Sequence, residues 1–160
     1  PFIPSPGTRI HTVKVRKLHL DCEWQDAVNG VGPSIRSDGV VQEVGHLYLP
    51  TGIGVVEEEE HVLLNYPNGD GSFAAALAWA AQLKLTPNDP RRVFAMAEQN
   101  HNLQRAVGMN PMHVSVIAPV PCAFRGYQWA CCACWGVSER AARLFWPDSL
   151  GRANDWFSFR

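Results

Sequence analysis

Three of the five cysteines lie within residues 127–135, an apolar tract typical of a strand that is covered on both faces. Alternate residues of a strand share a face, so Cys132 and Cys134 would point the same way. A hairpin before the tract would bring His113 roughly opposite them, with Cys122 in the connecting loop. Three thiols and an imidazole can bind a zinc-sized ion. No Cys-x-x-Cys pair is present, however, and free cysteine is among the most buried residue types. We therefore favour core packing and expect no cofactor, with a Cys/His metal-binding protein as an alternative.

A second chemistry is thiol catalysis, which requires a thiolate, a histidine within hydrogen-bond reach and a polar group that orients it. Cys22 has the most polar sequence surroundings of the cysteines, and His46 and His61 are its candidate partners. The flanking carboxylates of Asp21 and Glu23 would raise the pKa of this thiol, which argues against a nucleophile. A cysteine-dependent hydrolase is therefore the alternative, and a protein without catalytic activity is favoured.

The favoured function is binding through an aromatic-lined cleft. The six tryptophans come from almost every expected element. Tryptophan is bulky and its N–H needs a partner, so it often lies at a pocket wall or an interface. We expect the site to be lined by Trp129, Trp135 and His113, with Trp79 and Asn100 from the helices. The expected partner is a small apolar molecule or a second copy of the chain, which would make a homodimer.

Composition narrows the class of protein. The 160 residues are 46% hydrophobic and 18% charged, which is typical of one globular domain spanning residues 1–160. A net charge of -1 removes the electrostatic argument for a nucleic-acid partner. No segment approaches the ~20 apolar residues of a membrane span. The odd number of cysteines, two of them adjacent at Cys131 and Cys132, favours reduced thiols and a cytoplasmic location.

Several strands are expected before the middle of the chain. Residues 1–8 contain three prolines and should form an extended arm. Residues 10–24 alternate, with a phase change at Arg16-Lys17 that indicates a bulge or two short strands. Residues 40–49 are expected to form a strand, and residues 53–66 are its favoured hairpin partner, although their four glutamates also suit a helix.

Helices follow. Ser72 should cap a helix over residues 72–85, and Asp89-Pro90 should begin a second helix over residues 90–107, giving a helical hairpin. The remaining expected elements are a strand over residues 113–118, the tract at 127–135, a third helix from Ser138 to Pro147 and a last strand over 156–159. This order predicts an α+β fold: a mostly antiparallel sheet with a helical hairpin and a third helix packed on one face.

Overall fold

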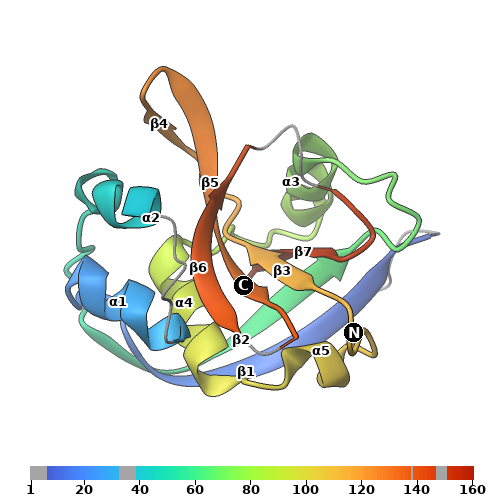
Figure 1. Cartoon of the computed structure of the whole chain (residues 1–160), viewed down its shortest axis with the longest axis horizontal. Coiled ribbons are helices and arrows are strands. Elements are labelled where there is room, and N and C mark those ends of the chain that lie inside the picture. Colours follow the sequence, from blue (N-terminus) through green and yellow to red (C-terminus); the bar gives the residue numbers. More distant parts are fainter. Residues whose placement is uncertain (1–6, 33–38, 138, 147–150) are drawn as a thin grey trace.

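The computed structural model describes residues 7–32, 39–137, 139–146 and 151–160. Within these ranges it contains seven strands and five α-helices, and the expected α+β class with a mostly antiparallel sheet is confirmed (Figure 1). Most of the arm expected over residues 1–8 lies outside the described ranges. No helix in the described ranges has the length and apolar character needed to cross a membrane.

One sheet joins all of the described strands. Their bounds are β1 Arg9–His19, β2 Val55–Asn65, β3 Val114–Ile117, β4 Cys122–Phe124, β5 Tyr127–Trp135, β6 Arg140–Phe145 and β7 Asp155–Phe159. Neighbouring strands follow the order β1, β2, β7, β3, β5 and β4, and β6 also pairs with β5. Every pairing is antiparallel except that of β3 with β7. The last strand in the sequence therefore lies inside the sheet, where it joins the β1–β2 ribbon to the other strands.

The cysteine-rich tract is β5, and its expected burial on both faces is confirmed. Cys131 and Trp135 point into a first core on one face of the sheet, whereas Ala130 and Cys132 point into a second core on the other. All four side chains are buried. This strand pairs with β3, β4 and β6 and so organises one half of the sheet.

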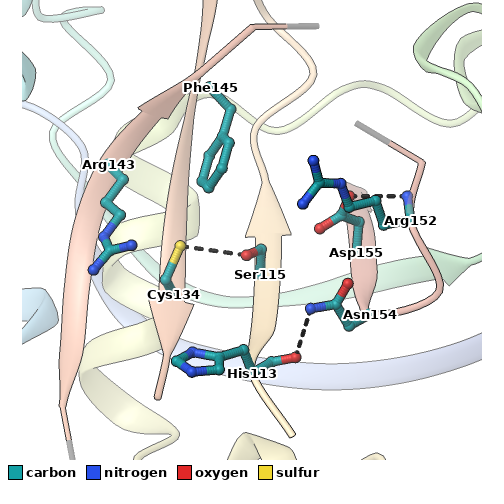
Figure 2. Close-up of a pocket in the computed structure, with 8 residues that line it drawn as sticks. All are labelled: His113, Ser115, Cys134, Arg143, Phe145, Arg152, Asn154 and Asp155. Carbon is teal, nitrogen blue, oxygen red and sulfur yellow. Dashed lines mark hydrogen bonds between the residues drawn. The ribbon is translucent and has the colours of Figure 1, made fainter. Parts of the chain in front are cut away.

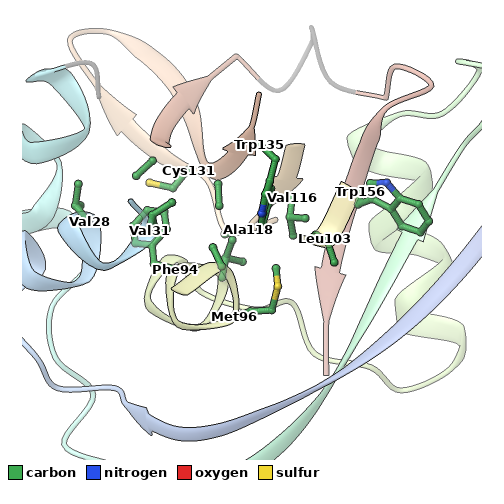
Figure 3. Close-up of a cluster of buried hydrophobic side chains, with 14 of the residues drawn as sticks. Val28, Val31, Phe94, Met96, Leu103, Val116, Ala118, Cys131, Trp135 and Trp156 are labelled. Atoms are coloured by element: carbon green, nitrogen blue, oxygen red, sulfur yellow. The ribbon is translucent and has the colours of Figure 1, made fainter. Parts of the chain in front are cut away.

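The first core lies between the sheet and helices α1 (Trp24–Val31), α4 (Pro90–Gln99) and α5 (Leu103–Ala106), as Figure 3 shows. Val28 and Val31 come from α1, while Phe94 and Met96 come from α4. The expected proline-containing start of α4 is confirmed, because the side chain of Asp89 accepts a hydrogen bond from the backbone N–H of Arg92. The helix ends at Gln99, earlier than expected, and the short helix α5 follows it.

The second core lies on the opposite face, beneath helix α3 (Phe73–Gln82). The expected cap is confirmed, since the Ser72 hydroxyl accepts a hydrogen bond from the Ala75 N–H at 3.0 Å. Trp79 and Ala80 of α3 pack against Phe157 and Phe159 of β7. The helices thus cover both faces of the sheet, and the expectation that they share one face is corrected.

Three further expectations for individual elements are wrong. Residues 40–49 form no strand; the chain there contains helix α2 (Gly39–Glu43) and a 3-10 helix, η1 (Gly45–Leu47). This segment wraps around Trp24, whose indole N–H donates to the Val41 carbonyl at 2.8 Å. Trp24 itself starts α1 instead of ending a strand. Because residues 40–49 form no strand, β2 pairs with β1 instead. The helix expected after Ser138 is the strand β6, and Ser138 itself lies outside the described residues.

Candidate functional site

The five residues expected to line an aromatic cleft are spread over the molecule. Trp135 is only 1% exposed, and its N–H donates to the carbonyl oxygen of Asn100 at 3.0 Å. Trp79 lies in the core on the other face of the sheet. Trp129 is partly buried on the β4–β5 hairpin. Only His113 among the five is exposed and lines a cavity that contains other reactive side chains.

The four candidate metal ligands are divided between the two faces of the sheet. The sulfur atoms of Cys132 and Cys134 are 3.5 Å apart on one face, and His113 lines the same cavity as Cys134. Cys122 lies in the first core, on the face to which Cys131 points. Within the described ranges, no group of three or more His, Cys, Asp or Glu side chains could hold a metal ion.

The residues of the expected hydrolase are also placed apart. Two cavities beside Cys22 are lined by His19. The ring of His46 is hydrogen-bonded to the backbone carbonyl of Glu43, and the buried ring of His61 is hydrogen-bonded to the carboxylate of Glu59. Burial is the main cause that raises the pKa of the Cys22 thiol. Neither expected histidine lines the cavities beside this cysteine.

A different site lies where β3, β5, β6 and β7 meet. A cavity of about 180 Å³ opens there, next to a second cavity of about 330 Å³ that shares His113, Cys134 and Arg143 with it. We name the two cavities together the Cys134 groove. The smaller cavity is lined by His113, Ser115, Cys134, Arg143, Phe145, Arg152, Asn154 and Asp155 (Figure 2).

The register of the sheet explains why these residues meet. Ser115 of β3 lies opposite Cys134 of β5 on one side and opposite Asp155 of β7 on the other. Arg143 of β6 lies opposite Cys132, one pair along the same face from Cys134. Four strands from the last third of the chain therefore contribute neighbouring polar side chains to a single patch of the sheet.

Cys134 is the central nucleophilic group of this groove. Its sulfur lies 3.5 Å from the Cys132 sulfur and 3.3 Å from the Ser115 hydroxyl oxygen, and it is partly exposed. The pKa of the Cys134 thiol is lowered, chiefly by its hydrogen bond with the Cys132 thiol; the hydrogen bond with Ser115 and the charge of Arg143 add to this effect. Burial and the same hydrogen bond raise the pKa of Cys132. The arrangement therefore favours loss of the proton from Cys134 before Cys132.

The loop before β7 forms one wall of the groove. Its backbone N–H groups at Gly151 and Arg152 donate to one carboxylate oxygen of Asp155, at 3.1 Å and 3.0 Å. Burial raises the pKa of Asp155 in spite of these hydrogen bonds. The side chain of Asn154 donates to the His113 carbonyl at 2.8 Å, which ties this loop to the start of β3. These contacts hold the wall in a defined position.

Two arginines and two carboxylates line the groove: Arg143, Arg152 and Asp155 lie in the smaller cavity, and Glu139 lies in the larger one. The guanidinium groups of Arg143 and Arg152 lie on opposite sides of the cavity in Figure 2. Among the described residues, neither group forms an ion pair with a carboxylate. The only carboxylate that lines the smaller cavity is Asp155. Arginine forks suit carboxylate and phosphate groups, so the smaller cavity, with two guanidinium groups and one carboxylate, has groups that could bind an anion.

Sequence reasoning identified His113 and Cys134 but missed the remaining lining residues. Arg143 lies in the segment that was expected to be a helix, where its pairing with β5 could not be foreseen. Arg152 lies in the loop before β7 and Asp155 at its first residue, and the central position of this strand in the sheet has no local sequence signal. The one available signal was the Cys-x-Cys spacing on a strand, which places two thiols on one face.

The chain was also compared with known proteins. No family model, curated protein or solved structure matches it. The chemistry of the groove is therefore the basis for assigning a function.

Proposed function

We propose that the chain is a binding protein for a small molecule that carries a carboxylate or phosphate group, and that the Cys134 groove is its site. The observation that supports this proposal is the pair of guanidinium groups, Arg143 and Arg152, that flank one cavity without an ion-pair partner among the described residues. Binding remains the class of function, as the sequence favoured, but the ligand is anionic and the site differs.

The other lining groups define the expected ligand more closely. Ser115 and Asn154 add hydrogen-bonding groups, and Phe145 adds an apolar wall. One carboxylate oxygen of Asp155 already accepts hydrogen bonds from the Gly151 and Arg152 backbone N–H groups, which partly offset the repulsion that its charge would exert on a bound anion. A small anion with one compact apolar part matches this combination better than a purely apolar molecule.

Amide chemical-shift titration tests the proposal. Inorganic phosphate and benzoate are added separately to the full chain at constant ionic strength, so that general screening does not change. We expect shifts at residues 134–143 and 151–155. Arg143→Gln and Arg152→Gln should each weaken binding about tenfold, because each removes a charge-assisted hydrogen bond. Arg105→Gln is the matched control, since Arg105 is exposed on α5 and lines neither cavity.

Three results would contradict the proposal. One is the absence of shifts with either anion, and another is equal weakening by Arg105→Gln. The third is saturable binding of a neutral apolar probe that is insensitive to both groove arginines, which would favour the aromatic cleft instead.

Self-association is a second candidate function, favoured by an exposed aromatic surface on the β4–β5 hairpin. Tyr127 is 57% exposed and stacks on Trp146 with ring centroids 5.3 Å apart. The ring of Trp129 contacts the same indole edge-on, with ring centroids 5.8 Å apart and an angle of 62° between the ring planes. Aromatic residues are enriched at protein interfaces. Sedimentation equilibrium of the chain and of Tyr127→Ser tests this candidate, which predicts a dimer that the substitution weakens.

The proposed location is the cytoplasm. All five cysteines are described and are free thiols. Reduced cysteines in this number accord with a reducing compartment.

A further inference from the structure

We infer that Cys132 and Cys134 form a peroxide-reactive dithiol, in which Cys134 is the attacking thiol and Cys132 the resolving thiol. This inference goes beyond the proposed binding function. It rests on three observations: the two sulfurs are 3.5 Å apart, only Cys134 of the two lines the groove, and the Ser115 hydroxyl is hydrogen-bonded to the Cys134 sulfur in a cavity that Arg143 also lines.

Access distinguishes the two thiols. Cys134 is partly exposed and lines both cavities of the groove, so a small oxidant can reach its sulfur. Cys132 is completely buried in the second core, directly behind it. Cys131 points to the opposite face of the strand and cannot reach Cys134. The pair therefore has one reactive and one protected member.

The chemistry balances with hydrogen peroxide as the oxidant. The Cys134 thiolate attacks one peroxide oxygen; an S–O bond forms, the O–O bond breaks and hydroxide leaves. The product is a sulfenic acid on Cys134. The Cys132 sulfur then attacks the Cys134 sulfur, the S–O bond breaks, and water leaves with the proton of the Cys132 thiol. Overall, two thiols and one peroxide give one disulfide and two waters.

The strand geometry makes this disulfide strained. Two residues that are two positions apart on a regular strand have Cα and Cβ atoms about 6.6 Å apart, whereas the Cβ atoms of a disulfide are about 3.5–4.5 Å apart, so β5 must bend locally for the bond to form. The sulfurs must approach from 3.5 Å to about 2.0 Å. Strained disulfides are readily reduced, so we expect dithiothreitol to restore the dithiol.

Mass spectrometry of the folded, reduced full chain tests the inference. A small molar excess of hydrogen peroxide should lower the intact mass by about 2 Da, the loss of two hydrogen atoms. Trypsin places Cys131, Cys132 and Cys134 in one peptide, residues 126–140, and Cys122 in another, residues 106–125. The expected disulfide therefore lowers the mass of peptide 126–140 by about 2 Da and forms no cross-link to peptide 106–125.

Substitutions identify the roles of the thiols. Cys134→Ser should abolish the mass loss, and Cys132→Ser should stop at a sulfenic acid that dimedone traps on Cys134. Cys131→Ala is the matched control and should behave like the unaltered chain. The peptide map of the unaltered chain serves as a second measurement if a variant fails to fold.

Four results would overturn the inference. These are a link between the 106–125 and 126–140 peptides, oxidation confined to Cys22, loss of the reaction in Cys131→Ala, and no mass change under conditions that oxidise free cysteine. Each of these outcomes can be distinguished from failure of the anion titration, because neither measurement depends on the other.

Discussion

At the scale of single residues, the surroundings decide what each thiol of β5 can do. Cys131 lies in the first core, where burial raises its pKa well above the ordinary value. Cys132, its neighbour, is buried on the other face, and its sulfur is hydrogen-bonded to that of Cys134. Cys134 lies at the edge of a cavity. The three cysteines at positions 131–134 are thus expected to differ in reactivity, because they lie on different faces of the strand and differ in exposure.

This distinction could be predicted only in part from the sequence. Alternation correctly placed Cys132 and Cys134 on one face and Cys131 on the other. The lowered pKa of Cys134 depends on Ser115 and Arg143, which reach it through the register of two other strands. The periodicity of one strand does not encode its register with another, and β6 was expected to be a helix, so the groove could not be foreseen.

His61 provides a prediction about pH. Its ring is fully buried, hydrogen-bonded to Glu59 and close to the charges of Arg92 and Arg160; burial is the largest cause that lowers its pKa from 6.5. The folded protein therefore binds fewer protons at this site than the unfolded chain, so stability must fall as pH falls below 6.5. The carboxylate of Glu59, whose pKa is also lowered, extends the loss below 4.5.

The measurement is the urea midpoint of the chain and of His61→Gln between about pH 8 and pH 5, where an unperturbed histidine titrates. We expect the unaltered chain to lose stability over this range and His61→Gln to lose less. His19→Gln is the control and should keep the original slope, because His19 is exposed. Asp155, with its raised pKa, acts in the opposite direction in every variant and cancels in the comparison. Identical slopes for the unaltered chain and His61→Gln would refute the prediction.

At the scale of elements, Lys17 marks an irregularity within β1. The expected phase change is present, since Val15 and Leu18 are both buried on either side of Arg16-Lys17. The register to β2 stays constant across this point, and Lys17 takes the left-handed conformation with φ 52°. The conformation of this single residue therefore shifts the alternation of buried and exposed side chains. The strand contains neither an inserted bulge nor a break at this point.

This conformation predicts that Lys17→Gly stabilises the protein. A left-handed backbone costs a residue with a Cβ atom about 1–2 kcal/mol, whereas glycine adopts it without strain. Glycine also loses more backbone entropy on folding, which offsets part of this benefit. We therefore expect a net gain of about 0.5–1 kcal/mol in the free energy of unfolding. Lys14→Gly is the matched control in the regular part of the same strand and should lose a similar amount. Chemical denaturation measures both, and a loss of stability in both variants would contradict the prediction.

The elements that were predicted correctly carry local signals, and those that were missed do not. Ser72 and Asp89-Pro90 marked helix starts through capping chemistry that acts within one turn. The segment Arg140–Phe145 has helix-forming residues, yet it pairs with β5 along its whole length because β5 is otherwise unpaired on that side. Helix α1 was hidden because Asn29-Gly30 suggested a loop, although Trp24, Val28 and Val31 follow helical spacing.

At the scale of the whole molecule, β7 connects the two cores. Its neighbouring residues Trp156 and Phe157 point to opposite faces, the first into the core under α1 and α4 and the second into the core under α3. The strand also bridges β2 and β3. Because both cores depend on the same strand, we expect them to unfold together.

Two substitutions test this cooperativity. Trp156→Ala and Phe157→Ala should each lower the free energy of unfolding by about 3–5 kcal/mol, as expected for large buried aromatic residues. Both variants should retain one transition that coincides by fluorescence and by circular dichroism. Val137→Ala, at a residue that is 82% exposed, is the control and should change little. Separate transitions for the two cores in either variant would show that β7 does not couple them.

The inclined indoles of Trp129 and Trp146, 5.8 Å and 62° apart, also have an optical consequence. Two like chromophores held this close and at an angle exchange excitation, and their ultraviolet bands split into a pair of opposite sign. The far-ultraviolet spectrum of the protein should therefore contain an exciton couplet superimposed on the backbone signal. Such a couplet reports the orientation of the β4–β5 hairpin relative to β6, and it would change if a partner moved that hairpin without altering any helix or strand.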